Sequence, residues 1–163
     1  MSRTGNSVAA FETHGEDLLH YLQRRVGDDA ADLLGDVMVV VWKRADEAPA
    51  DDVDCRRWLF GIARMTVLGH RRDVQRQLRL SARVKTALLP PPTPDHDEAL
   101  DVRRAIAALP EDQAELVRLV HWEGLSLADA AQVMGLNAST ARGRYQKARE
   151  ELARVLTVAS EPG

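Results

Sequence analysis

Hydrophobic positions recur at helical spacing along nearly the whole 163-residue chain, and no run of four or more residues alternates as a half-buried strand does. Four of the seven prolines fall within Leu89–Asp97, which rules out a helix there and favours an extended, semi-rigid linker. The pattern predicts an all-α protein. Two small helical domains, residues 1–80 and 98–163, are joined by a Pro-rich linker at residues 81–97.

The first domain begins with an amphipathic segment that predicts one helix or a broken pair, ending at Gly27. Its apolar positions are Val8, Phe11, Leu18, Leu19, Leu22 and Val26. A second helix is predicted from Asp29 to Arg44, with one wide apolar face. That face comprises Ala30, Leu33, Leu34, Val37, Met38, Val41 and Trp42.

Two valines of the second helix do not fit its apolar face. Val39 falls on the polar side, three residues after Asp36 and seven after Asp32, and Val40 lies at the edge. Scattered exposed apolar residues are common and explain this pattern. The alternative is a partner-binding surface that combines Asp32, Asp36 and Val39.

A third helix is predicted to begin near Arg56, after an acidic loop from Asp46 to Asp54. Arg57, Arg64 and Arg71 follow one another at intervals of seven residues, with Arg72 beside them. The stripe is either a solvated charged face or a nucleic-acid surface. The near absence of compensating acids favours the second interpretation, since ordinary surfaces interleave both signs.

The second domain contains the pattern of a helix-turn-helix. A helix begins at Pro110 and stops near Gly124; Ser126 then caps a short helix, Leu127–Met134, which Gly135 ends. Asn137 caps the next helix, which buries Ala141, Tyr145, Ala148, Leu152 and Val155 or Leu156. Small residues at Ala130 and Ala131 suit a close crossing of helices. The alternative is a helical hairpin used only for packing.

The outward face of that last helix has the chemistry of a recognition helix. The residues that point away from its apolar stripe are Ser139, Thr140, Arg142, Gly143, Gln146 and Lys147. Arg and Gln side chains can read base edges in the major groove, while Lys147 and Arg149 can hold phosphates. Gly143 weakens the helix by about 1 kcal/mol relative to alanine, a cost that close approach to the groove would offset.

The net charge of −3 argues at first against a nucleic-acid partner, but it is distributed unevenly. Residues 28–54 carry a net −7, residues 56–79 a net +6 and residues 137–149 a net +4. One cysteine, Cys55, excludes a disulfide framework and is too isolated to form a redox switch within the chain. Without a membrane span or leader-like N-terminus, the expected location is cytoplasmic.

The same features leave three other classes of protein open: an enzyme, a helix-turn-helix repressor or activator, and a protein-binding adaptor. An enzyme is disfavoured because the five histidines are dispersed and no phosphate-binding loop or nucleophile setting occurs, and no metal or cofactor is expected. A repressor or activator with a sensing or dimerising domain would bind an operator by itself. A protein-binding adaptor leaves both basic segments unexplained.

Taken together, the two halves resemble a known family. The segment Asp29-Ala-Ala-Asp-Leu-Leu-Gly-Asp-Val-Met-Val-Val-Val-Trp42 precedes Trp58-Leu-Phe-Gly-Ile-Ala-Arg64, the linker and Leu109-Pro110. Glu123-Gly-Leu-Ser-Leu-Ala-Asp-Ala-Ala-Gln-Val-Met-Gly135 and Thr140-Ala-Arg-Gly-Arg-Tyr-Gln-Lys-Ala-Arg149 follow. Over residues 8–156 this order is similar to bacterial RNA polymerase sigma factors of the extracytoplasmic-function (ECF) group.

The resemblance implies a transcription initiation factor whose first domain binds core polymerase and reads the −10 element, while its second reads the −35 element. The implied polymerase-binding residues are Asp32, Leu33, Asp36, Val39 and Val40. The implied −10 residues are Arg56, Arg57, Arg64, Met65, Arg71 and Arg72, together with the loop Asp46–Asp54. The implied −35 residues are Ser139, Thr140, Arg142, Gly143, Gln146, Lys147 and Arg149.

The implied partners are promoter DNA, core RNA polymerase through the clamp of its largest subunit and its flap, and an anti-sigma factor. Asp95 and Asp97 of the linker would mimic nucleic-acid charge inside the polymerase.

Gly35, Asp36 and Met65 depart from the usual residues of the family, which bears on the clamp contact and on −10 base choice. The acidity of the loop favours a position facing protein or solvent. Only 4% of residues are aromatic, which predicts limited DNA melting and dependence on a good promoter.

Overall fold

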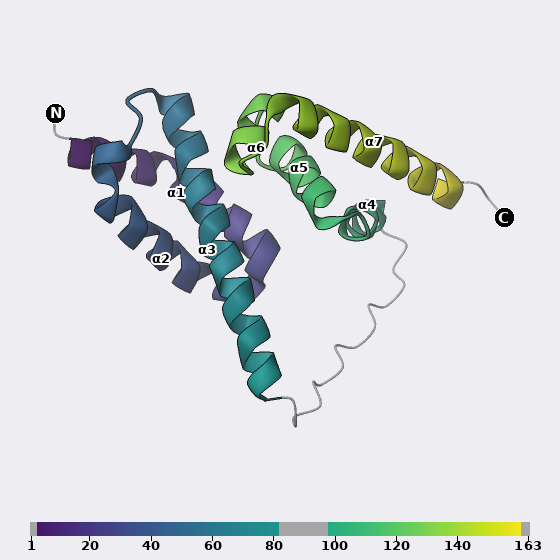
Figure 1. The fold of residues 1–163 in the computed structure, drawn as a ribbon, viewed down its shortest axis with the longest axis horizontal. Helices are drawn as coiled ribbons and strands as arrows, with labels where there is room; N and C mark the ends of the chain where they lie inside the picture. Colours follow the sequence, from purple (N-terminus) through teal and green to yellow (C-terminus); the bar gives the residue numbers. More distant parts are fainter. Residues whose placement is uncertain (1–2, 82–97, 161–163) are drawn as a thin grey trace. The chain divides into compact units, whose positions relative to one another are not determined.

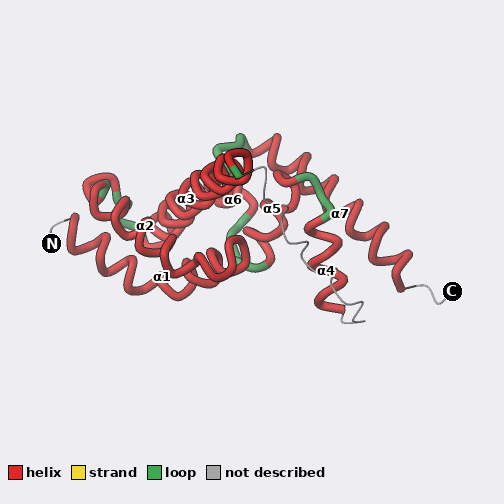
Figure 2. Tube along the Cα trace, turned by 90° about the horizontal axis from the view of Figure 1, so that it is seen from below, coloured by secondary structure: helices red, strands yellow, loops and turns green. Residues whose placement is uncertain are grey.

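The computed structural model describes residues 3–81 and 98–160, and every regular element within these ranges is a helix (Figures 1 and 2). The chain divides into two compact units, one built from α1, α2 and α3, the other from α4, α5, α7 and most of α6. The predicted all-α class with two small helical units is confirmed. Apart from Ser81, the predicted linker lies outside the described residues, as do Asp95 and Asp97.

The first unit is a bundle of three helices in mutual contact (Figure 1). Its elements are α1 (Arg3–Val26), a 3₁₀ turn at Gly27–Asp29, α2 (Ala30–Lys43), a 3₁₀ turn at Ala45–Glu47 and α3 (Asp52–Leu80). The core contains the completely buried Leu18, Leu22 and Leu59. Within it the rings of Tyr21 and Phe60 meet edge to face, with centroids 5.3 Å apart. Such aromatic pairs contribute about 0.5–1.5 kcal/mol beyond area burial.

Helix α1 is one continuous helix and not a broken pair, and it ends where predicted, because Gly27 takes a left-handed φ of +62°. Its buried stripe differs from the expected one. Val8 is exposed, whereas Ser7 and His14 are buried. The stripe passes through positions 7, 10, 14, 18 and 21, so the hydrophobic side chain at position 8 lies one residue away from it.

Helix α2 agrees with the predicted helix to within one residue at each end, but its buried face is narrower than expected. Ala30, Val37 and Val41 are buried, whereas Met38 is 38% and Trp42 60% exposed. The prediction that these two larger side chains face the core was wrong. The buried residues recur every three or four positions in a single narrow stripe, and Met38 and Trp42 each follow a member of it by one residue.

Helix α3 begins at Asp52, four residues before the predicted start. The carboxylate of Asp51 accepts a hydrogen bond from the backbone N–H of Asp54 at 3.0 Å and so caps the helix. Asp52 and Asp54 occupy the first turn, where negative charge is favourable beside the positive end of the helix dipole. The last third of the segment predicted to be an acidic loop, Asp52–Asp54, is therefore the capped beginning of the helix.

The second unit consists of α4 (Glu98–Ala107), α5 (Glu111–His121), α6 (Leu127–Val133) and α7 (Ala138–Ser160). Helix α4, for which the sequence pattern made no separate prediction, packs on α5 and α7. The core is centred on Ile106, Leu109, Ala114, Val117 and Ala148, with Trp122, Tyr145 and Leu152 packed against it.

The helix-turn-helix of the second unit has the predicted caps. The Ser126 hydroxyl accepts from the backbone N–H of Asp129 at 3.1 Å, and the Asn137 side chain accepts from that of Thr140 at 2.8 Å. Gly135 makes the turn between α6 and α7 with φ +68°. The helix-turn-helix prediction is confirmed.

Candidate nucleic-acid and polymerase interfaces

Helix α7 presents one polar, basic face to solvent. All the predicted −35 residues are exposed except Thr140, which is half-buried. On the opposite side Ala141 and Ala148 are completely buried. From Ala138 to Arg149 the helix contains no acidic residue, so no negative side chain of this segment repels an anionic ligand. The face has the chemistry of a major-groove recognition surface.

Two contacts to α5 fix the orientation of α7. The Arg144 guanidinium pairs with Asp112 at 2.8 Å, which turns one of the four basic side chains of the segment towards the protein. His121 and Tyr145 share a hydrogen bond of 2.8 Å, and their rings stack with centroids 6.1 Å apart. Because both contacts leave from the side of α7 that faces α5, they hold the recognition face outward without covering it.

The predicted arginine stripe of α3 divides into two groups. Arg56 pairs with Asp17 of α1 at 3.5 Å and lies over the Phe60 ring, and Arg57 pairs with Asp54 at 3.2 Å. Arg64 and Arg71 are half-buried, while Arg72 and the predicted −10 residue Met65 are exposed. Arg56 and Arg57 therefore hold structural partners at the beginning of the helix. Arg72, the exposed arginine of the predicted set, lies further along it.

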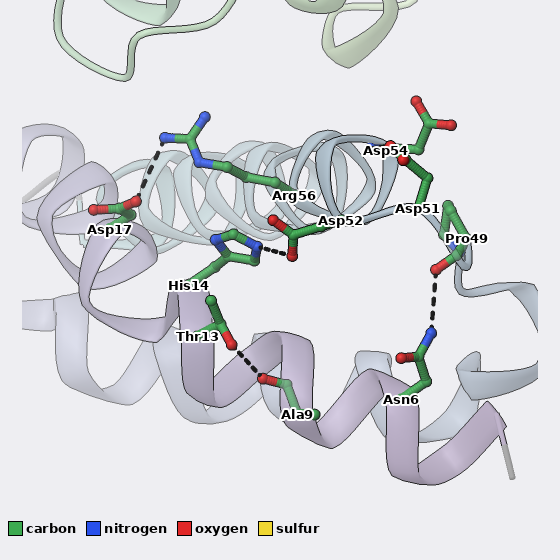
Figure 3. A network of polar contacts seen from close by, with 10 residues as sticks. All are labelled: Asn6, Ala9, Thr13, His14, Asp17, Pro49, Asp51, Asp52, Asp54 and Arg56. Carbon is green, nitrogen blue, oxygen red and sulfur yellow. Dashed lines mark hydrogen bonds and ion pairs between the residues drawn. The ribbon is translucent and has the colours of Figure 1, made fainter. Parts of the chain in front are cut away.

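The acidic residues before and within the first turn of α3 have partners inside the protein. The Arg44 guanidinium donates to Glu47 at 2.6 Å, and this hydrogen bond lowers the pKa of the Glu47 carboxyl. Asp52 accepts from His14 at 3.1 Å (Figure 3), Asp54 pairs with Arg57, and Asp51 is the helix cap. The high acidity of this segment thus reflects local structure, which the sequence pattern alone did not reveal.

The outer side of α2 is a mixed acidic and apolar surface. Asp32 and Asp36 are exposed, Val39 is 47% exposed and Val40 is half-buried. Leu33, in contrast, is 6% exposed and lies on the core side of α2, so its side chain offers little surface to a partner. Sequence reasoning missed Met38 and Trp42, which extend the exposed apolar surface, because their spacing matched a core face.

Other kinds of site find no support in the described residues. No three His, Cys, Asp or Glu side chains lie close enough together there to hold a metal ion. Cys55 is buried, and burial raises the pKa of its thiol, so the reactive thiolate form is disfavoured. Among the helices of residues 3–81 and 98–160, none is long and apolar enough to span a membrane.

These features define a helix-turn-helix DNA-binding protein in which a three-helix unit precedes the helix-turn-helix unit along the sequence. Residues 10–77 match the family described as Sigma-70 region 2, and residues 99–152 match Sigma-70, region 4. ECF RNA polymerase sigma factor SigF of Caulobacter vibrioides is 32% identical over 85% of this chain and 79% of its own length. SigM of Mycobacterium tuberculosis is 32% identical over 85% and 71%.

Solved structures give the same result. The sigma factor RpoE of Bartonella quintana, in complex with the anti-sigma factor NepR, superposes with a TM-score of 0.68 at 26% identity, covering 91% of this chain and 97% of that one. CnrH, in complex with the cytosolic domain of CnrY, shares the fold with a TM-score of 0.63 at 24% identity. The chain belongs to the ECF group of RNA polymerase sigma factors, regulatory transcription factors that direct the polymerase to promoters.

Proposed function

We propose that the two units divide promoter recognition between them, the first reading the −10 element and the second the −35 element. The observation that carries this proposal is the exposed, acid-free basic face of α7, held outward by contacts on its other side. The proposed boundaries are residues 1–80 for the first function and 98–163 for the second.

On α7, Arg142 and Gln146 are the side chains with the chemistry to read base edges, because both can form paired hydrogen bonds with a purine. Lys147 and Arg149 would hold phosphates, and Ser139 and Thr140 lie at the beginning of the helix, where a recognition helix enters the groove. The proposal assigns Gly143 the role of letting the helix backbone approach the DNA.

In the first unit, the −10 element would meet the Arg44–Asp51 connection and α3. The exposed Met65 and Arg72, with the half-buried Arg64 and Arg71, are the proposed DNA contacts. Arg56 and Arg57 contribute positive potential, but their ion pairs with Asp17 and Asp54 give them a structural role as well. This favours DNA contacts centred on the middle and later turns of α3.

The outer side of α2 is the proposed contact for the polymerase clamp. It combines the carboxylates of Asp32 and Asp36 with the exposed apolar side chains of Met38, Val39 and Trp42. An exposed apolar surface rimmed by charge is typical of a protein-binding site. We propose that an anti-sigma factor covers the same surface, as the complexed state of the Bartonella relative supports.

Run-off transcription with purified core polymerase tests whether α7 of the second unit reads the −35 element. Arg142→Ala should lower transcription from a promoter with an intact −35 element, and the loss should disappear when that element is replaced by unrelated sequence. Arg103→Ala, an exposed arginine on α4, is the matched control and should leave the output unchanged. Equal losses from both promoters would contradict the assignment of the −35 element to α7.

A binding assay with core enzyme tests the α2 surface. Val39→Ser should weaken binding, whereas Val102→Ser, at an exposed valine of the second unit, should not. We propose that the chain binds promoter DNA tightly only together with core polymerase. Tight, specific promoter binding by the chain alone would contradict this and would favour a repressor or activator.

A further inference from the structure

Three polar contacts from α1 hold the end of the α2–α3 connection and the first turns of α3 (Figure 3). Asn6 donates to the Pro49 carbonyl at 3.5 Å, His14 contacts Asp52 at 3.1 Å, and Asp17 pairs with Arg56 at 3.5 Å. The three contacts occur in the same order along α1 and along the chain from Pro49 to Arg56. This sequence of contacts sets the position of the beginning of α3 along α1.

The central contact joins a buried side chain to an exposed one. The His14 side chain is 8% exposed, whereas that of Asp52 is 74% exposed. A carboxylate only accepts hydrogen bonds, so the Nε2 atom of His14 is the donor. The imidazole is held by the packing of the bundle, and it therefore restrains Asp52 and the first turn of α3 instead of being restrained by them.

The 3₁₀ turn of this connection packs on α1. Between Arg44 and Glu47, Ala45 is buried. The backbone hydrogen bonds of this part of the connection lie within the 3₁₀ turn. From Ala48 to Asp51 the chain is half-buried or exposed. Asn6 and His14 of α1 thus add long-range polar restraints to the segment proposed to face the −10 element.

We infer that His14 is a positioning residue for −10 recognition: its hydrogen bond to Asp52 holds the Arg44–Asp51 connection and the first turn of α3 in the DNA-reading position. His14 touches no DNA in this mechanism. The inference rests on the proposed function of the first unit. It adds a residue of α1 to those that determine the specificity for the −10 element.

The test uses the full chain with core polymerase and two promoters that differ only in the −10 element, one matched and one altered. His14→Leu fills the buried site without a donor, and Asp52→Ala removes the acceptor from the exposed side. Each should lower the ratio of transcription from the matched promoter to that from the altered one by about tenfold. His14→Gln retains an N–H donor and should restore much of the ratio.

Three controls separate positioning from folding and from the underlying proposal. His20→Leu, the same change at an exposed site of α1, should leave the ratio unchanged. The double variant His14→Leu/Asp52→Ala should lose no more than either single variant, because the two residues act through one contact. Core binding and response to the −35 element should stay at wild-type values in every variant.

The outcomes are distinguishable. If the wild-type protein does not discriminate between the two promoters, the proposed −10 function fails. If it discriminates and both single variants do so equally well, or if they lose transcription from both promoters in proportion, the inference about His14 is overturned while the proposed function stands.

Discussion

Replacement of Gly143 by alanine separates the stability of α7 from its function. Gly143 is exposed in the interior of the 23-residue helix, and a Cβ built there meets no atom within 4 Å. The backbone is already helical, so an alanine fits without strain. The gain expected from helix propensity alone is about 1 kcal/mol. For a unit of this size unfolding in its own transition, that corresponds to a rise in Tm of about 4–8 °C.

The same methyl group would project from the middle of the face proposed to enter the major groove. We therefore expect Gly143→Ala to weaken the contribution of the −35 element by at least about fivefold, or ~1 kcal/mol, even though the protein is more stable. Thermal unfolding by circular dichroism measures the first effect. Polymerase-dependent promoter binding, with and without an intact −35 element, measures the second.

Gly35→Ala is the matched control, because Gly35 is also exposed within a helix and has open space around its Cβ position. It should raise the Tm to a similar extent and leave the −35 contribution unchanged. A fall in Tm on Gly143→Ala would refute the propensity argument. An unchanged −35 contribution in the more stable variant would refute close approach of the backbone to DNA.

Four further predictions concern the first unit. Trp42→Ala should change the free energy of unfolding by less than about 0.5 kcal/mol but weaken core polymerase binding in a pull-down titration, because the indole is largely exposed. Glu47→Gln should unfold at slightly lower denaturant concentration than wild type at neutral pH. Since the hydrogen bond from Arg44 lowers the pKa of Glu47 in the folded state, the difference should disappear as the pH falls through that lowered pKa. Buried Cys55 should react slowly with iodoacetamide until the protein unfolds, as mass spectrometry would show. With Phe60 buried, permanganate footprints should show a short bubble that is lost on weak promoters; an extended bubble there would contradict this.

Local signals in the sequence predicted the helix ends well. Gly27 and Gly135 have the left-handed φ that ends a helix or makes a tight turn, and Ser126 and Asn137 form the predicted caps. These features depend on a few adjacent residues, so they can be read without knowledge of the fold. The beginning of α3 was misplaced because Asp52 and Asp54 were interpreted as loop residues, although acids are also favoured in the first turn of a helix.

Features that depend on contacts between helices could not be predicted in the same way. Periodicity placed Trp42 on the core face, but which part of an apolar face is covered depends on where the neighbouring helices lie. The packing of the bundle buries His14, whose ring contacts Asp52, thirty-eight residues later, and no local pattern marks that pair. The exposure of the candidate residues was therefore predicted best on α7, where it follows from one helix, and least well around the beginning of α3.

The far end of α3 has a consequence for local stability. Every residue from Arg72 to Leu80 is exposed, so these last turns lack the packing that supports the rest of the helix. Their amides should exchange with solvent deuterium through local fraying, far faster than those around Leu59 in the core. Phosphates that bind the arginines there would slow this exchange, so hydrogen exchange would reveal how far along α3 the promoter extends.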